Sequence, residues 1–244
     1  MAQSSQKKAN YVLPIAITFA LFFMIAFVTG YQNPLGSIIK NVSGGSTIWT
    51  QLGNLMNFIA YAFMGYPAGL ILQKYGYRIT ALLASMVGFV GVLLTYISGT
   101  IDASTSADLV LTVYMTGAFV AGFSMCMLNS VVNPLMNSMG STPDRGNQML
   151  QFGGAFNSLG ATLAPVVVGY IIGGQATEIS EVNPVFYMCM GIFALALVVL
   201  YFSKLPEAPD FGQKKEKIDA RGAFRYSNFV LGIIAIFCYV GVEV

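Results

Sequence analysis

The polar side chains within the apolar stretches of this 244-residue sequence are mostly neutral amides and hydroxyls, and some of the amides recur at helical spacing. Asn129, Asn133 and Asn137 are four residues apart, so each step turns only ~40° around a helix and all three share one face. An amide both donates and accepts hydrogen bonds, which suits the neighbouring hydroxyl groups of a sugar. The predicted solute-binding residues are Asn33, Asn54, Asn57, Tyr61, Asn129, Asn133, Gln151 and Asn157.

These amides also have a simpler interpretation as hydrogen bonds between packed helices, worth roughly 0.6 kcal/mol each in membrane bundles. We favour packing for Asn137 and Gln148, which lie near the predicted ends of their helices. We favour a solute cavity for Asn33, Asn129 and Asn133, because they lie beside prolines that interrupt helical hydrogen bonding.

The triplet Asn-Pro-Leu occurs at residues 33–35 and again at residues 133–135. A proline cannot donate to the carbonyl four residues earlier, so the Gly30 and Ser130 carbonyls lose that donor. If the two helices run in opposite directions, the breaks are related as in a pair of inverted three-helix repeats, which is typical of transporters. The alternative is that both prolines are coincidental packing kinks.

The chemistry of most enzymes is absent from the sequence. It contains no histidine and no G-x-x-x-x-G-K-[ST] phosphate loop, so the commonest general base and an ATPase motif are both missing. The three cysteines, Cys126, Cys189 and Cys238, have no paired spacing, which favours neither a disulfide framework nor a metal site. We therefore expect no enzyme activity, no cofactor and no metal.

The composition predicts a membrane protein. Apolar residues make up 56% of the chain, charged residues 9%, and the mean hydropathy is +0.69, whereas soluble domains carry about 25% charged residues. The apolar stretches long enough to cross a bilayer are 11–32, 48–73, 79–99, 109–139, 147–173 and 184–203. A seventh begins near Asn228 and is barely complete at Val244, so we expect the natural protein to continue.

The six complete stretches contain no charged residue between their ends. Glu243, in the seventh, is therefore the ion-coupling candidate, because ionisable residues inside membranes commonly mark ion pathways. The alternative is that Glu243 reaches a membrane surface.

The lysines and arginines predict the orientation, because loops on the cytoplasmic side carry an excess of them. They cluster before the first span, in alternate turns and in the loop after the sixth. We predict a cytoplasmic tail at 1–10, a six-helix bundle at 11–203, a basic cytoplasmic loop at 204–225, and the beginning of a seventh helix at 226–244. The net charge of +2 reflects this topology and gives no reason to expect contact with nucleic acid. The apolar stretches make the lipid bilayer the expected partner.

The turn at residues 69–78 reads GLILQKYGYR. It resembles the loop motif G-x-x-x-D-[RK]-x-G-x-[RK] of the major facilitator superfamily, with matching positions at Gly69, Lys74, Gly76 and Arg78. Gln73 replaces the acidic residue of the motif. In the family that acid is thought to latch the two halves together, so the resemblance implies a weaker, amide latch.

Within the superfamily, the chain is similar to the fucose permease and glucose/galactose transporter branch. The similarity rests on residues 21–23, 67–69, 133–134, 156–160 and 237–241. It implies a twelve-helix protein, so that the C-terminal half is missing from this chain. Fucose-type members are proton symporters with carboxylates at positions that fall on Asn33 and Asn129 here, which puts proton coupling in doubt.

We therefore expect an all-α membrane protein: the six-helix N-terminal bundle of a major facilitator, built from two inverted three-helix repeats, plus the start of a seventh helix. The expected function is transport of a neutral monosaccharide across the inner membrane, coupled to H⁺ or Na⁺ or purely facilitative. An exporter of amphipathic solutes and a non-transporting membrane scaffold or sensor are the alternatives.

Overall fold

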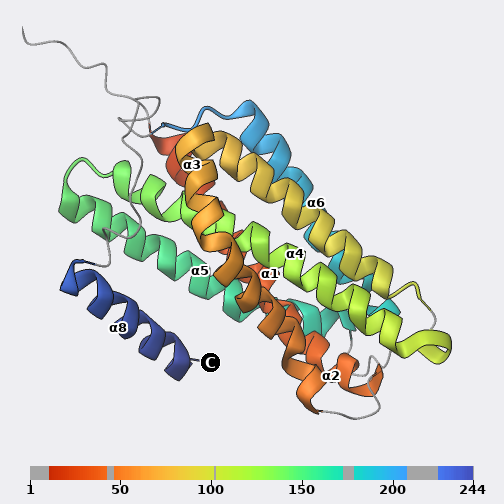
Figure 1. Ribbon diagram of the computed structural model, residues 1–244. Helices are drawn as coiled ribbons and strands as arrows, with labels where there is room; N and C mark the ends of the chain where they lie inside the picture. The colour runs from red at the N-terminus through yellow and green to blue at the C-terminus, as the bar shows by residue number, and fades with distance from the viewer. Residues whose placement is uncertain (1–10, 43–46, 102, 173–178, 208–224, 244) are drawn as a thin grey trace, which may run out of the picture. The chain divides into compact units, whose positions relative to one another are not determined.

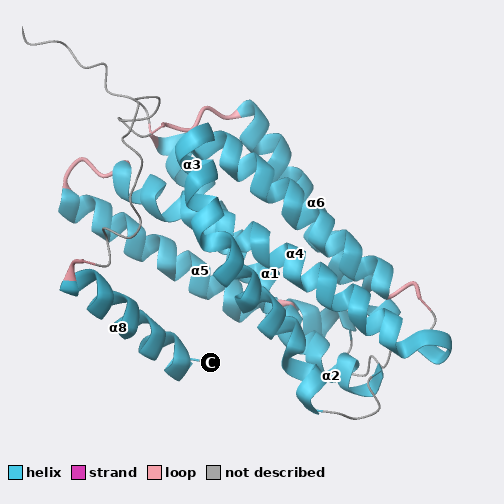
Figure 2. Cartoon of the chain, in the orientation of Figure 1, coloured by secondary structure: helices cyan, strands magenta, loops and turns pink. Residues whose placement is uncertain are grey.

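A computed structural model describes residues 11–42, 47–101, 103–172, 179–207 and 225–243, and these contain helices and turns but no strand (Figures 1 and 2). The elements are α1 (Val12–Gly30), α2 (Gln32–Val42), α3 (Thr47–Ser98), α4 (Ala103–Ser138), α5 (Pro143–Ile172), the short 3₁₀ helix η1 (Ile179–Val182), α6 (Asn183–Phe202) and α8 (Ser227–Glu243). The predicted spans are confirmed as helices, whereas η1 was not predicted.

The chain divides into two compact units, Met1–Phe211 and Gly212–Val244. The second unit contains α8, an apolar helix of 17 residues that corresponds to the predicted seventh span. The first unit contains the other helices, among which α3 packs on α4 and α6, and α1 packs on α5.

Two predicted spans, 48–73 and 79–99, form a single element that is bent at Gly76. This glycine has φ of +78° and ψ of 177°, so α3 consists of two arms on either side of a non-helical residue. A positive φ is costly for residues with a Cβ atom and easy for glycine. The sequence of the loop motif thus produces the turn between the second and third spans.

The two Asn-Pro-Leu triplets have different local structures. The first span is longer than predicted and is interrupted at Tyr31, between α1 and α2. Pro34 lies in the first turn of α2, where a missing N–H removes no helical hydrogen bond. The expected break at Pro134 is absent: α4 continues to Ser138 because fully buried neighbours such as Leu135 hold the helix in the bundle.

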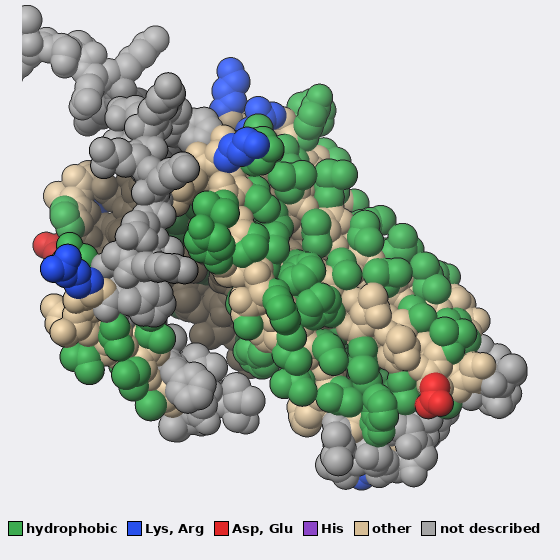
Figure 3. Space-filling view, viewed as in Figure 1, with side chains coloured by type: hydrophobic (Ala, Val, Ile, Leu, Met, Phe, Trp, Pro, Cys, Tyr) green, Lys and Arg blue, Asp and Glu red, His purple; other side chains and the backbone are tan. Residues whose placement is uncertain are grey.

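The described helices include five that are long and apolar enough to cross a membrane, with the bent α3 counted once. Charged side chains gather toward the ends of the helices, and most of the visible surface between them is hydrophobic (Figure 3). Apolar side chains are stable in hydrocarbon while charges favour water. The chain is therefore a multi-pass membrane protein.

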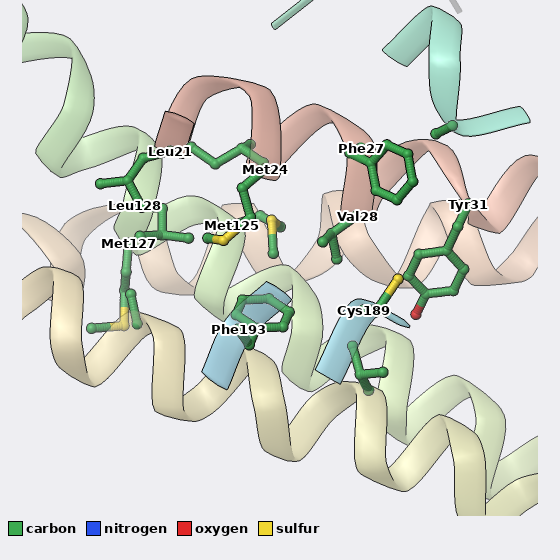
Figure 4. Packing of buried hydrophobic residues seen from close by; sticks show 14 of the residues in the cluster. Leu21, Met24, Phe27, Val28, Tyr31, Met125, Met127, Leu128, Cys189 and Phe193 are labelled. Atoms are coloured by element: carbon green, nitrogen blue, oxygen red, sulfur yellow. The ribbon is translucent and has the colours of Figure 1, made fainter. Parts of the chain in front are cut away.

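The core of the first unit consists largely of buried side chains from α1, α3, α4 and α6. Met24 of α1 points toward Met125 of α4, with Phe193 of α6 nearby, and all three are almost fully buried (Figure 4). The backbones of α1 and α5 lie close together, since a Cβ atom at Gly160 would lie 2.5 Å from the Phe23 carbonyl oxygen. Glycine at this position lets the two backbones meet, as small residues commonly do in membrane bundles.

Candidate solute-binding site

A chain of hydrogen bonds joins three of the predicted binding residues on α3 and α4. Asn129 Nδ2 donates to Tyr61 Oη at 2.9 Å and to the Met125 carbonyl oxygen at 3.1 Å. One turn further along α4, Asn133 Nδ2 donates to the Asn129 carbonyl oxygen at 2.9 Å. Asn129 and Tyr61 are half-buried and Asn133 is exposed, so the cluster reaches the surface of the unit.

The four-residue stripe continues to Asn137, which is also exposed. A Cβ atom added to Gly146 of α5 would collide with Asn137 Oδ1 and with the Asn137 carbonyl oxygen. Asn137 therefore lies against the start of α5, near the end of α4. This position is consistent with the packing role expected for Asn137.

On α5, Asn157 is half-buried and donates from Nδ2 to the Phe22 carbonyl oxygen of α1 at 3.1 Å. Gln151 is exposed on the same helix. Asn157 thus contacts α1, whereas the Asn129 cluster contacts α3. No hydrogen bond among the described residues joins Asn157 to the Asn129 cluster.

Asn57 lies inside the unit, with only 3% of its surface exposed. Its Nδ2 atom donates to Gln32 Oε1 of α2 at 2.5 Å, and its Oδ1 atom has no hydrogen-bond partner. This arrangement favours packing between α3 and α2 over direct contact with a solute. Asn54, at the same end of α3, is half-buried and donates to Gln51 Oε1 at 3.4 Å.

Two further predicted residues, Asn33 and Glu243, have side chains that the structure does not describe. Asn33 is part of α2 and Glu243 is the last residue of α8, but only their backbone positions are described. Their roles as a solute contact and as an ion-coupling group stay predictions. Among the described residues, no group of three His, Cys, Asp or Glu side chains could hold a metal ion.

The loop motif is held by a residue that the sequence did not single out. The carboxylate of Glu207 accepts hydrogen bonds from the backbone N–H of Tyr77, at 2.7 Å, and of Arg78, at 3.3 Å. In return, Arg78 donates from Nε to the Leu200 carbonyl oxygen at 3.2 Å, and from Nη2 to that of Tyr201. The acid caps the start of the second arm of α3, and the arginine caps the end of α6.

Other motif positions are less constrained. Gln73 and Lys74 are exposed, and the Lys74 ammonium lies 5.1 Å from the centre of the Tyr75 ring. Nothing lies within 4 Å of a Cβ atom placed on Gly69. The sequence offered one signal for Glu207: it is an acidic residue that follows Pro206 just after the sixth apolar span.

Two hollows in the first unit are apolar. One, of about 300 Å³, lies between α1 and α6 and includes Ala20 and Ala196; the other, of about 520 Å³, lies between α1 and α5 and is lined by Phe19, Phe23 and Phe156 among others. Neither hollow contains a predicted binding residue. Partly open surfaces of α3, α4 and α5 instead hold Asn54, Tyr61, Asn129, Asn133, Gln151 and Asn157, whereas Asn57 is buried.

The family model of the Major Facilitator Superfamily matches residues 15–243. The chain belongs to the major facilitator superfamily. The glucose/galactose transporter of Brucella abortus (biovar 1, strain 9-941) is 30% identical over 251 residues, which cover 99% of this chain and 58% of that protein. The putative glucose/galactose transporter of Helicobacter pylori (strain 26695) is 25% identical, with 98% and 59% covered.

The crystal structure of the E. coli fucose:proton symporter is similar to this major facilitator chain with a TM-score of 0.73 at 19% sequence identity. The similarity covers 96% of this chain and 60% of the symporter chain. This confirms the predicted fold, the N-terminal half of a major facilitator. Together with the family model and the Brucella relative, it confirms the resemblance to the fucose permease and glucose/galactose transporter branch. Membership of a transporter family agrees with the expectation that the chain is not an enzyme.

Proposed function

We propose that this major facilitator is a secondary transporter that moves a neutral monosaccharide of the fucose, glucose or galactose type across the inner membrane by alternating access. The Asn129–Tyr61–Asn133 cluster is the observation that carries the proposal. It combines amides and a phenol on two packed helices and is open to one side. The Brucella and Helicobacter relatives are named as glucose/galactose transporters, which supports a sugar as the solute.

The charges of the described residues support a neutral solute. No described acidic or basic side chain contacts the Asn129–Tyr61–Asn133 cluster, and the described charged residues of α4 and α5, Asp108, Asp144 and Arg145, lie near the helix ends. A charged solute would require a fixed opposite charge, because removing an ion from water without a partner is costly. Hydroxyl groups need only hydrogen bonds.

The proposed topology places the N-terminus in the cytoplasm, with segments as predicted: 1–10, the bundle 11–203, the loop 204–225 and helix seven from 226. Lys74, Arg78 and Lys204 flank the turn within α3 and the end of α6, and such basic clusters favour the cytoplasmic side. The coupling cation is H⁺ or Na⁺, or transport is facilitative. For H⁺, Glu243 is the candidate within this chain, and the C-terminal half would supply the opposite wall of the pathway.

The second candidate is an exporter of amphipathic solutes. The hollow lined by Phe19, Phe23 and Phe156 favours it, because stacked rings such as Phe19 and Phe156, 4.9 Å apart, suit an apolar compound. A sugar-uptake assay separates the two candidates.

The test is uptake of radiolabelled glucose, galactose and fucose by bacterial cells that lack their own transporters for these sugars. The protein is produced from its complete gene, with whatever sequence follows Val244. We expect saturable uptake of at least one sugar, abolished by an excess of the unlabelled sugar. Absence of sugar uptake, combined with lower accumulation of an amphipathic dye, would favour the exporter.

A further inference from the structure

The donor hydrogens of Asn129 and Ser130 are fully used inside the bundle. The Asn129 amide nitrogen donates to Tyr61 Oη and to the Met125 carbonyl oxygen. The Ser130 hydroxyl donates to the Cys126 carbonyl oxygen at 2.9 Å. An amide nitrogen has two hydrogens and a hydroxyl has one. Neither residue therefore has a donor left for a solute.

The remaining atoms of these two residues are hydrogen-bond acceptors. The Met125 carbonyl oxygen can only accept, so the amide nitrogen of Asn129 must face it and Oδ1 occupies the other branch of the amide. Ser130 Oγ keeps its lone pairs, and the Ser130 carbonyl oxygen lacks its usual helical donor because residue 134 is proline. Asn129 Oδ1, Ser130 Oγ and the Ser130 carbonyl oxygen form what we term the acceptor patch.

Two other amides of the predicted site, one on α4 and one on α5, have the same polarity. Asn133 and Asn157 each direct Nδ2 at a backbone carbonyl oxygen, of Asn129 and of Phe22 respectively. Each keeps one N–H and presents its Oδ1 atom elsewhere. Asn133 and Asn157 thus each keep one donor, as does the Tyr61 hydroxyl, whereas Asn129 and Ser130 present acceptors alone.

We infer that the acceptor patch recognises the solute through the protons of the solute's hydroxyl groups, and so selects for solutes that donate hydrogen bonds at that position. The inference rests on the proposed function and names which half of each hydrogen bond the protein supplies. A sodium ion would also be attracted to uncharged oxygens. However, the described carboxylate of α4, Asp108, lies near the opposite end of the helix from the patch, and a neutral hydroxyl needs no such charge.

The experiment measures how well sugar analogues inhibit uptake by the protein produced from its complete gene. At each ring position, a deoxy analogue lacks the hydroxyl group, and a deoxyfluoro analogue keeps a weak acceptor but lacks the proton. We expect one ring position at which both analogues inhibit uptake about tenfold more weakly than the parent sugar. At that position the deoxy and deoxyfluoro analogues should inhibit equally well. A patch that donates hydrogen bonds would instead favour the fluoro analogue over the deoxy analogue.

Variants of the protein test whether the acceptor patch binds the hydroxyl group at this ring position of the sugar. In Asn129→Ala and in Ser130→Ala, the advantage of the parent sugar at that position should fall severalfold. The matched control Asn137→Ala, on the same stripe, should keep it. Ser130→Ala removes no hydrogen bond between helices, which separates recognition from folding.

Tyr61→Phe gives a result that a purely structural role would not produce. Loss of the phenol removes the Tyr61 O–H and releases one N–H of Asn129, so Asn129 itself acquires a donor. The fluoro analogue should then inhibit better than the deoxy analogue at the same position, while the two stay equal in the wild type.

Three outcomes would overturn the inference. Fluoro analogues that match the parent at every position would show that the site donates. A changed sodium dependence in Asn129→Ala, with analogue discrimination intact, would make the patch a cation site. If no sugar is transported at all, the proposed function fails together with the inference; if sugars are transported without the predicted discrimination, only the inference fails.

Discussion

At Asn129, an uncharged amide occupies a position where the resemblance to fucose-type proton symporters implies a carboxylate. The amide donates to Tyr61 and to the backbone of its own helix. An amide does not take up or release a proton at physiological pH. At the proposed site, Asn129 would therefore supply hydrogen bonds to a solute but could not itself carry a proton.

Asn129→Ala should weaken solute binding by about 1–3 kcal/mol, because a bound hydroxyl group would lose its acceptor and Tyr61 its donor. Asn137→Ala should change binding much less, since Asn137 lies beside the start of α5. Competition with unlabelled sugar in membrane vesicles measures both. Equal losses in the two variants would indicate helix packing in place of solute contact.

Gly76→Ala should destabilise the protein by about 1–3 kcal/mol from its backbone conformation alone, because φ of +78° with ψ of 177° is a region occupied almost only by glycine. It should cost more in total, because the new Cβ atom would collide with the Glu207 carboxylate. The measurement is thermal unfolding in detergent, followed with a thiol-reactive dye that reports exposure of the buried Cys126 and Cys189, after the exposed Cys238 is replaced by serine.

Two comparisons separate strain from collision. Gly65→Ala, in a helix with nothing within 4 Å of the added Cβ, should be neutral or slightly stabilising. In a Glu207→Ala background, Gly76→Ala should still destabilise the protein through its backbone conformation, but without the added cost of the collision. An unchanged melting temperature in the single Gly76→Ala variant would contradict the described turn.

At the scale of elements, the bend of α3 and the end of α6 cap each other. Glu207 lies at the positive end of the second arm of α3, and Arg78 lies at the negative end of α6. Since residues 78 and 207 are 129 positions apart, this pair holds the start of the central loop against the turn of the loop motif. It acts within one half, whereas the family's acid, replaced here by Gln73, is thought to latch the two halves.

Glu207→Ala should lower stability by about 1 kcal/mol, the usual cost of removing a helix cap. Glu207→Gln should have a smaller effect, because the amide oxygen can still accept one of the two hydrogen bonds. Gln73→Ala, at an exposed position, is the control and should leave the melting temperature unchanged. A Glu207→Ala protein as stable as the wild type would show that the cap contributes nothing.

At the scale of the whole molecule, the chain spans 58% of the length of its Brucella relative. Residues 1–244 alone should not transport, because one six-helix bundle forms only one wall of an alternating-access pathway. Reconstitution of this segment in liposomes tests the expectation. Saturable sugar uptake by a monomeric 1–244 protein would refute it.

Glu243 is the group within this chain on which proton coupling would depend. In the protein produced from its complete gene, Glu243→Gln should abolish uptake driven by an imposed pH gradient while sparing exchange of sugar across the membrane. Proteoliposomes allow both measurements. A proton-driven overshoot that survives the substitution unchanged would assign coupling to residues outside this chain.

Local properties were readable from the sequence. The membrane spans follow from the apolar stretches, because the bilayer responds to the hydropathy of each segment by itself. The amide stripe of α4 follows from helical geometry, and the turn at Gly76 follows from a motif of ten residues. These features depend on residues close together in the chain, so the order of the sequence was enough to predict them.

Only the tertiary structure decided which partner each polar group meets. Asn57 resembled Asn129 in sequence, but it is buried against Gln32, whereas Asn129 reaches Tyr61 and the surface. The acceptor character of Asn129 depends on two partners inside the bundle, and the capping role of Glu207 depends on a turn 130 positions away. Such pairings are set by how distant helices pack, since a buried hydrogen bond forms with whatever group the packing brings within reach.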